Sequence, residues 1–163
     1  MAIVFTTLLV FLVGRGYCSV AEVTGTDVNA TDAEGVTALM YSAARNESPE
    51  VISALIEAGA HVNVGNEDGV TPLMCAAYCN INAEVIRVFI NSGTDVNVKD
   101  RNGMAALIHT AGWNEDPEVI DVLLDAGADA SLKDDFGKTA FDYATENENV
   151  RGTATYWRLL MLG

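Results

Sequence analysis

The chain has 163 residues, of which 50% are hydrophobic, and its 23 acidic and 9 basic residues give a formal net charge of -14. This length suffices for one domain with a buried core. The excess of acid excludes a protein that binds nucleic acid or anionic lipid through a basic surface, because such binding needs a positive electrostatic footprint.

The first 21 residues differ in composition from the rest of the chain. Ile3 to Val13 form an apolar run of 11 residues, too short for a helix that crosses a bilayer, which needs about 20. The run is typical of a signal-peptide core, and the small residues Ser19, Val20 and Ala21 predict cleavage after Ala21. We therefore expect a periplasmic or secreted protein without stable membrane insertion. Because no Lys or Arg precedes the run, two alternatives stay open: an uncleaved membrane anchor and an N-terminal helical cap.

The remainder of the chain is built from repeats. Two sets of glycines recur with a period of 34 residues: Gly35, Gly69, Gly103 and Gly137, and Gly25, Gly59, Gly93 and Gly127. A fixed period of this length predicts a solenoid. The predicted units are a partial repeat over 22–34 that contributes only a hairpin, full repeats over 35–68, 69–102 and 103–136, and a C-terminal capping repeat over 137–163.

The first half of each unit is predicted to be a turn closed by glycine and a short helix. Residues 37–45 are the template, in which Ala43 and Ala44 allow another helix to approach closely. Asn46, Asn80 and Asn114 follow at one position, where we expect a left-handed helix end, because Asn tolerates that conformation better than most residues.

The second half of each unit is predicted to be another helix and an extended segment. Capping oxygens open this helix at Ser48, Asn82 and Asp116, and glycines such as Gly59 end it. Extended segments such as 60–64 then lead to the next turn. The final helix, over 155–163, closes the solenoid, with Trp157 and Leu160 expected to point inward.

This order of elements, with the motifs 69–74 (GVTPLM), Ala76-Ala77 and 92–97 (SGTDVN), resembles the ankyrin repeat family. The resemblance implies an all-α solenoid of 34-residue helix-turn-helix units with short β-hairpin turns. The extra residue in the loop between the helices is similar to small exported bacterial members. Met40, Met74 and Ile108 stand where the family usually has His, so we expect apolar packing in place of its link to the turn.

The resemblance also implies a function, which is binding a protein partner on the concave face. The family's contact positions are the hairpin tips and the exposed end of the first helix. Carried over, they give the candidate contact residues Glu34, Arg45, Glu67, Asp68, Val70, Tyr78, Arg101, Met104, Trp113 and Phe136. Trp, Tyr and Arg are enriched in interface hot spots. The alternative is that Tyr78 and Trp113 only pack on each other and shield the groove.

The sequence contains no recognisable catalytic arrangement. Cys75 and Cys79 are neighbours on one helix surface, but with His109 they supply fewer ligands than the four of a structural zinc site. We therefore expect no enzyme activity, no metal, no cofactor and a monomer. An alternative function is periplasmic protection against oxidative stress, in which Met40, Met74, Cys75 and Cys79 take part in redox chemistry.

Overall fold

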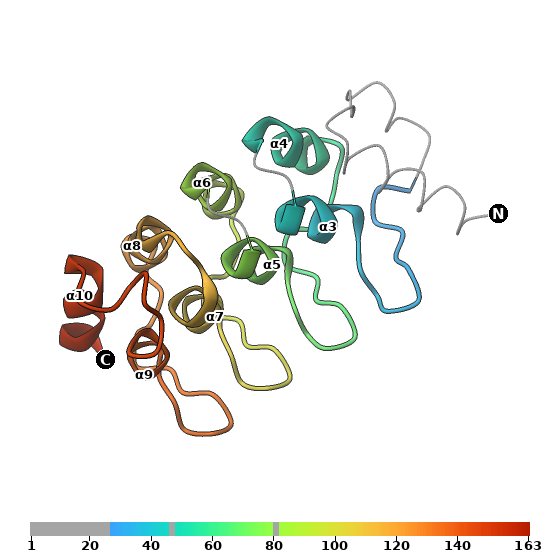
Figure 1. Ribbon diagram of the computed structural model, residues 1–163. Helices are drawn as coiled ribbons and strands as arrows, with labels where there is room; N and C mark the ends of the chain where they lie inside the picture. The colour runs from blue at the N-terminus through green and yellow to red at the C-terminus, as the bar shows by residue number, and fades with distance from the viewer. Residues whose placement is uncertain (1–26, 46–47, 80–81) are drawn as a thin grey trace.

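A computed structural model describes residues 27–45, 48–79 and 82–163, and within these ranges it contains eight α-helices stacked in two rows (Figure 1). The inner row consists of α3 (Ala38–Arg45), α5 (Pro72–Cys79), α7 (Ala106–Trp113) and α9 (Ala140–Ala144). The outer row consists of α4 (Pro49–Glu57), α6 (Ala83–Asn91), α8 (Pro117–Asp125) and α10 (Ala154–Leu162). The predicted all-α repeat solenoid is therefore confirmed.

Small and branched apolar residues give each row its spacing. Ala43, Ala77 and Ala111 are fully buried in the inner row, where the absence of bulk lets successive helices pack closely. Ile86 and Ile120 of the outer row are also fully buried and belong to the same continuous core. Each repeat thus buries its face against its neighbours, as expected of a solenoid.

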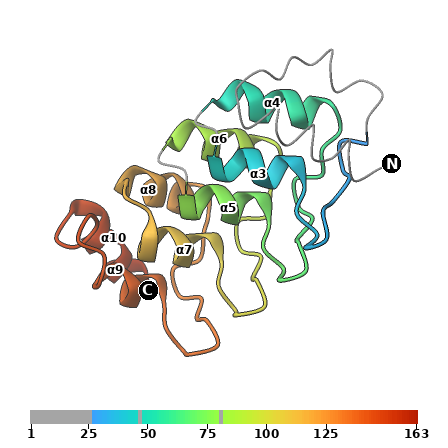
Figure 2. The same ribbon diagram turned by 45° about the vertical axis from the view of Figure 1, so that its right-hand side comes forward.

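Hairpin loops precede the inner helices and project beyond them on one side, as Figures 1 and 2 show. Gly35, Gly69, Gly103 and Gly137 close these loops with φ of 77° to 79°, a conformation that favours glycine. The described residues contain one isolated β-bridge, between Thr31 and Thr37, and no strand. We call the surface formed by the hairpin loops and the exposed side of the inner helices the inner face.

The predicted caps of the outer helices are confirmed in two repeats and wrong in one. Asn82 and Asp116 accept hydrogen bonds from the backbone N–H groups of Glu84 and Glu118, at 3.0 and 2.9 Å. Ser48 makes no side-chain cap bond, because its hydroxyl donates to the Glu50 carboxylate at 2.6 Å.

The prediction of a left-handed helix end is wrong at Asn114. This residue has φ -74° and ψ 145°, which is extended backbone. Its side chain is buried, donates to the Ala77 carbonyl at 2.8 Å and accepts from the Asp116 N–H at 2.9 Å. Asn114 therefore ends α7 in an extended conformation and joins two repeats through its side chain, while Asn46 and Asn80 lie outside the described residues.

The segments predicted to be extended contain a turn. Turns lie at 28–29, 62–63, 96–97 and 130–131. In three of them an aspartate accepts the backbone N–H two residues further on, as Asp95 does from Asn97 at 3.0 Å. This local bond favours a turn over a strand.

The predicted rotation of the final helix is also wrong. Trp157 and Leu160 of α10 are 56% and 46% exposed. Thr155 and Leu159 face the core instead. Thr155 donates to Asp121 of α8 at 2.6 Å, so this side of α10 lies against the solenoid.

Candidate partner-binding face

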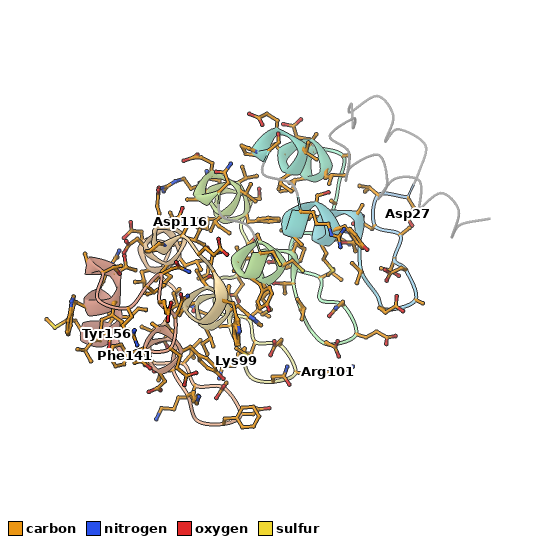
Figure 3. The ribbon with its side chains drawn as sticks, in the orientation of Figure 1. Asp27, Lys99, Arg101, Asp116, Phe141 and Tyr156 are labelled. Carbon is orange, nitrogen blue, oxygen red and sulfur yellow. The ribbon has the colours of Figure 1, made fainter. Side chains whose placement is uncertain are left out.

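The predicted contact residues at the hairpin tips form one group on the inner face. Glu34, Glu67, Asp68, Arg101 and Phe136 are all exposed, Phe136 by 83%. Backbone hydrogen bonds join neighbouring tips, from the Glu67 N–H to the Glu34 carbonyl at 3.3 Å and from the Arg101 N–H to the Asp68 carbonyl at 2.9 Å. Figure 3 shows Arg101 at the end of its loop. The tips therefore form a regular row of exposed, mostly acidic side chains.

Two of the predicted contact residues, Val70 and Met104, are less exposed than those at the hairpin tips. Met104 is only 8% exposed and lies in the hydrophobic core, so the expected exposure of this residue is not found. Val70, its counterpart one repeat earlier, is half-buried against the same core. Lys138 holds the same position in the last hairpin and is half-buried, so burial at this position varies between repeats.

A second group lies on the inner helices and is aromatic. The rings of Tyr78 on α5 and Trp113 on α7 have centroids 5.7 Å apart, and each side chain is 45% exposed. Trp113 also contacts Tyr143 of α9, with centroids 5.3 Å apart. We call Tyr78, Trp113 and Tyr143 the aromatic track. The two predicted rings do pack on each other, yet about half of each remains open to solvent.

Tyr143 is not among the predicted contact residues, because it lies at the helical position of Cys75 and not at the exposed end of the helix. Its hydroxyl donates to the Asp134 carboxylate at 2.6 Å, and this bond, with burial, raises the pKa of Tyr143 to about 12. Burial raises the pKa of Asp134, but hydrogen bonds from Tyr143 and from the backbone N–H groups of Lys138 and Phe136 outweigh it and lower that pKa below its ordinary value. The track is thus fixed to the hairpin of the last repeat.

His109 makes the equivalent connection one repeat earlier. Its Nε2 lies 3.0 Å from Oδ2 of Asp100, whose other oxygen accepts the N–H groups of Asn102 and Met104. Met40, Met74 and Ile108 are buried in the slot one residue before, as predicted. The helix-to-turn link is therefore made in the last two repeats by the next residue along the helix. The sequence signal for this link is that polar or aromatic residues recur at that position of the inner helix.

A cation lies near each end of the aromatic track. Lys138 Nζ lies 5.0 Å from the centre of the Tyr143 ring and 3.5 Å from the Glu146 carboxylate. At the other end, the Arg45 guanidinium lies 5.3 Å from the centre of the Tyr41 ring. Both contacts are of the cation–π type.

The thiols are poorly suited to redox chemistry. Burial, together with the nearby Cys79, raises the pKa of Cys75 to about 12. Burial also raises the pKa of the exposed Cys79, although the positive charge of Arg45 opposes that rise. Reactive cysteines have lowered pKa values, because the thiolate is the nucleophile. Met40 and Met74 are buried as well, so the structure argues against the redox alternative.

Metal binding depends on how polar side chains are grouped, and membrane insertion depends on the length and apolarity of helices. Within residues 27–45, 48–79 and 82–163, no three His, Cys, Asp or Glu side chains are grouped so that they could hold a metal ion. None of the helices in those ranges has the length and apolarity required to span a bilayer.

Comparison with known proteins gives a single assignment. The family model for ankyrin repeats (3 copies) matches residues 8–100 and, in an overlapping second match, residues 79–156. No curated protein matches the sequence. Ankyrin repeats generally act as protein–protein interaction modules and typically serve as non-enzymatic scaffolds. The matched range and the stacked helical hairpins show that the chain belongs to the ankyrin repeat family.

Proposed function

We propose that the chain is a scaffold that holds a protein partner on its inner face. The observation that carries this proposal is the exposure of Tyr78 and Trp113, which lie on helices whose other apolar residues are mostly buried. Each ring is 45% exposed, although the two contact each other. Large aromatic side chains supply much of the binding energy at protein interfaces when a partner excludes water from them.

The hairpin tips provide a polar rim for the same surface. Glu34, Glu67, Asp68 and Arg101 differ from one repeat to the next at positions that backbone hydrogen bonds hold in a row. Rim charges influence the choice of partner and the association rate more than the total affinity. Phe136 adds an exposed aromatic side chain on the last hairpin.

Capture from an extract of the source cells tests this proposal. Immobilised wild-type protein, the double variant Tyr78→Ala/Trp113→Ala and the control Trp157→Ala are compared, and retained proteins are quantified by mass spectrometry. Trp157 is a matched control because it is an exposed tryptophan on the outer row. We expect wild type and control to enrich the same partner and the double variant to lose it, with circular dichroism unchanged in all three. Equal recovery by the double variant, or no enriched protein with wild type, would reject the proposal.

We also propose that residues 1–21 direct export and are then removed. The support is the apolar run of 3–13 and the small residues before Glu22. These residues lie outside the described ranges, and the family match from residue 8 supports the competing interpretation, a helical cap that belongs to the solenoid. The intact mass of the protein recovered from fractionated cells separates them. An exported protein that starts at Glu22 supports export, and an intact N-terminus in the cytoplasmic fraction contradicts it.

A further inference from the structure

The inner and outer helices differ in charge. The inner helices α3, α5 and α7 contain no Asp or Glu. The outer helices α4, α6 and α8 contain six: Glu50, Glu57, Glu84, Glu118, Asp121 and Asp125. The one acid on the inner helix α9, Asp142, is held in a capping box by Thr139. In a chain with a net charge of -14, acid is thus kept away from the helices that carry Tyr78 and Trp113.

The two arginines on the outer helices are both held in ion pairs. Arg87 binds Glu84 of its own helix and also Glu118 of the next repeat, the latter at 3.1 Å. Arg158 binds two acids of the preceding repeat, Asp121 at 2.9 Å and Asp125 at 2.6 Å. Both arginines therefore join neighbouring repeats through acidic groups at the surface.

On the inner face, Arg45 and Lys138 lie on aromatic rings, whereas Arg101 at a hairpin tip lies 3.9 Å from the Asp68 carboxylate. Arg45 contacts the Tyr41 ring and Lys138 contacts the Tyr143 ring. Lys138 also pairs with Glu146, but the side chains of this pair are 44% and 73% exposed, so water can compete for both. The track consequently has a cation near each end and uncharged rings between them.

We propose that this surface binds an extended segment of a partner protein that has an apolar centre and a carboxylate near each end. One carboxylate would bind Arg45, the other Lys138, and the apolar residues would cover Tyr78 and Trp113. This inference rests on the proposed function and adds the chemistry of the partner. Arg45 lies on α3, and Lys138 lies two residues before α9, three repeats along. Packed helices are about 8–10 Å apart, and an extended chain advances about 3.3 Å per residue. The two carboxylates should therefore be roughly seven to nine residues apart.

The charge distribution favours a short acidic segment over a polyanion. A nucleic acid would meet the exposed acids of the first two hairpins, Glu34, Glu67 and Asp68, in addition to the negative field of the whole protein. A peptide with two carboxylates responds mainly to the charges beside it, because the Debye length is about 8 Å at 0.15 M salt. A basic segment would bind at the acidic hairpin tips and would not need Arg45 or Lys138.

Selection from a library of phage-displayed random peptides tests the inference. The peptides have about 12 residues, which is longer than the estimated span, and they are selected at about 0.15 M salt. Wild type, Arg45→Gln/Lys138→Gln and the control Arg87→Gln are panned in parallel. Arg87→Gln removes one positive charge from the outer row. We expect wild type and control to select pairs of Asp or Glu at the estimated spacing, and the double variant to lose that preference. The inference is overturned if wild type selects Lys or Arg, selects peptides without acid, or selects no peptide. It is also overturned if the double variant selects the same acid pattern as wild type.

A synthetic copy of the best selected peptide then gives the affinity. The chain has two tryptophans, so Trp157→Phe leaves Trp113 as the only indole reporter. Peptide binding should change Trp113 fluorescence, and replacing both acids of the peptide by Gln should weaken binding about tenfold or more. If no acidic peptide is selected but Tyr78→Ala/Trp113→Ala still loses the cellular partner, this inference fails while the proposed function stands.

Discussion

The side-chain amide of Asn97 donates a hydrogen bond to the carbonyl of Gly127 in the next repeat, at 3.1 Å. The Asn97 side-chain oxygen accepts the N–H of Asp129 from the same turn, at 2.8 Å. The same pair of bonds starts from Asn29 and from Asn63 at the two preceding interfaces. Because the stability of a solenoid is roughly a sum of repeat and interface terms, each such asparagine contributes to cohesion between repeats.

Replacing Asn97 by Ala should lower the free energy of unfolding by about 1–2 kcal/mol, since two hydrogen bonds between repeats are lost. Urea unfolding monitored by circular dichroism measures this change. Asn102→Ala is the matched control, because the bond of Asn102 to the next hairpin uses its backbone oxygen, which alanine retains. Equal destabilisation by both substitutions would show that the Asn97 side chain does not join the repeats.

Ala105→Thr should stabilise the protein. Thr37, Thr71 and Thr139 hold the equivalent position in the other repeats, and each hydroxyl accepts the N–H three residues on, whereas Ala105 caps α7 without a side-chain bond. A restored cap contributes about 0.5–2 kcal/mol and should raise the melting temperature. Ala105→Val adds similar bulk without the hydroxyl. A gain with Val equal to that with Thr would assign the effect to packing instead of capping.

Tyr143→Phe should destabilise the protein in a pH-dependent way. The lowered pKa of Asp134 means that its stabilising contribution is present above the unfolded value of about 4 and is lost as pH falls through the folded value. The raised pKa of Tyr143, about 12, means that its contribution is present below the unfolded value of about 10 and is lost as pH rises towards 12. The stability difference between wild type and variant should therefore be largest from about pH 5 to 9 and smaller at pH 3 and pH 11. A difference that stays constant across this range would contradict the Tyr143–Asp134 bond.

Alkylation of the thiols should be slow at neutral pH. Cys79 is exposed but has a raised pKa, and Cys75 is more buried with a pKa of about 12, so little thiolate is present at either residue. Iodoacetamide labelling followed by peptide mass analysis should show Cys79 reacting more slowly than free cysteine, and Cys75 more slowly still. Denaturant should make both rates similar. Rapid labelling of either native thiol would revive the redox alternative.

Local features explain why most of the fold could be predicted from the sequence. The helices before Gly59, Gly93 and Gly127 end as expected, because glycine accepts the positive φ that stops each of them. The caps at Asn82 and Asp116 are likewise decided by residues within one turn. The spacing of such local signals is enough to specify a stack of helical hairpins.

Features that depend on distances between repeats were not predictable in this way. Asn114 has the residue type of a left-handed helix end, but its amide reaches Ala77 in the preceding repeat. The rotation of α10 depends on the bond from Thr155 to Asp121, 34 positions apart in the sequence. A single sequence shows which residues recur but not which of them meet across an interface.

The candidate contact surface was predictable where it depends on the residue pattern of one helix, and not where it depends on burial or on contacts between repeats. Tyr78 and Trp113 were identified because they interrupt a pattern of small residues at exposed helical positions. Met104 aligns with the half-buried Val70 but is itself buried, a difference that alignment of the repeats does not reveal. Tyr143 entered the surface only through its ring contact with Trp113.

Hydroxyl-radical footprinting with the captured partner tests the central claim most directly. The chain carries one exposed tryptophan on each row, Trp113 on the inner helix α7 and Trp157 on the outer helix α10, so the experiment contains its own control. If the partner binds the inner face, oxidation of Trp113 and Tyr78 should fall severalfold on binding while oxidation of Trp157 stays the same. Protection of Trp157 with no change at Trp113 would show that the partner binds elsewhere and would contradict the account.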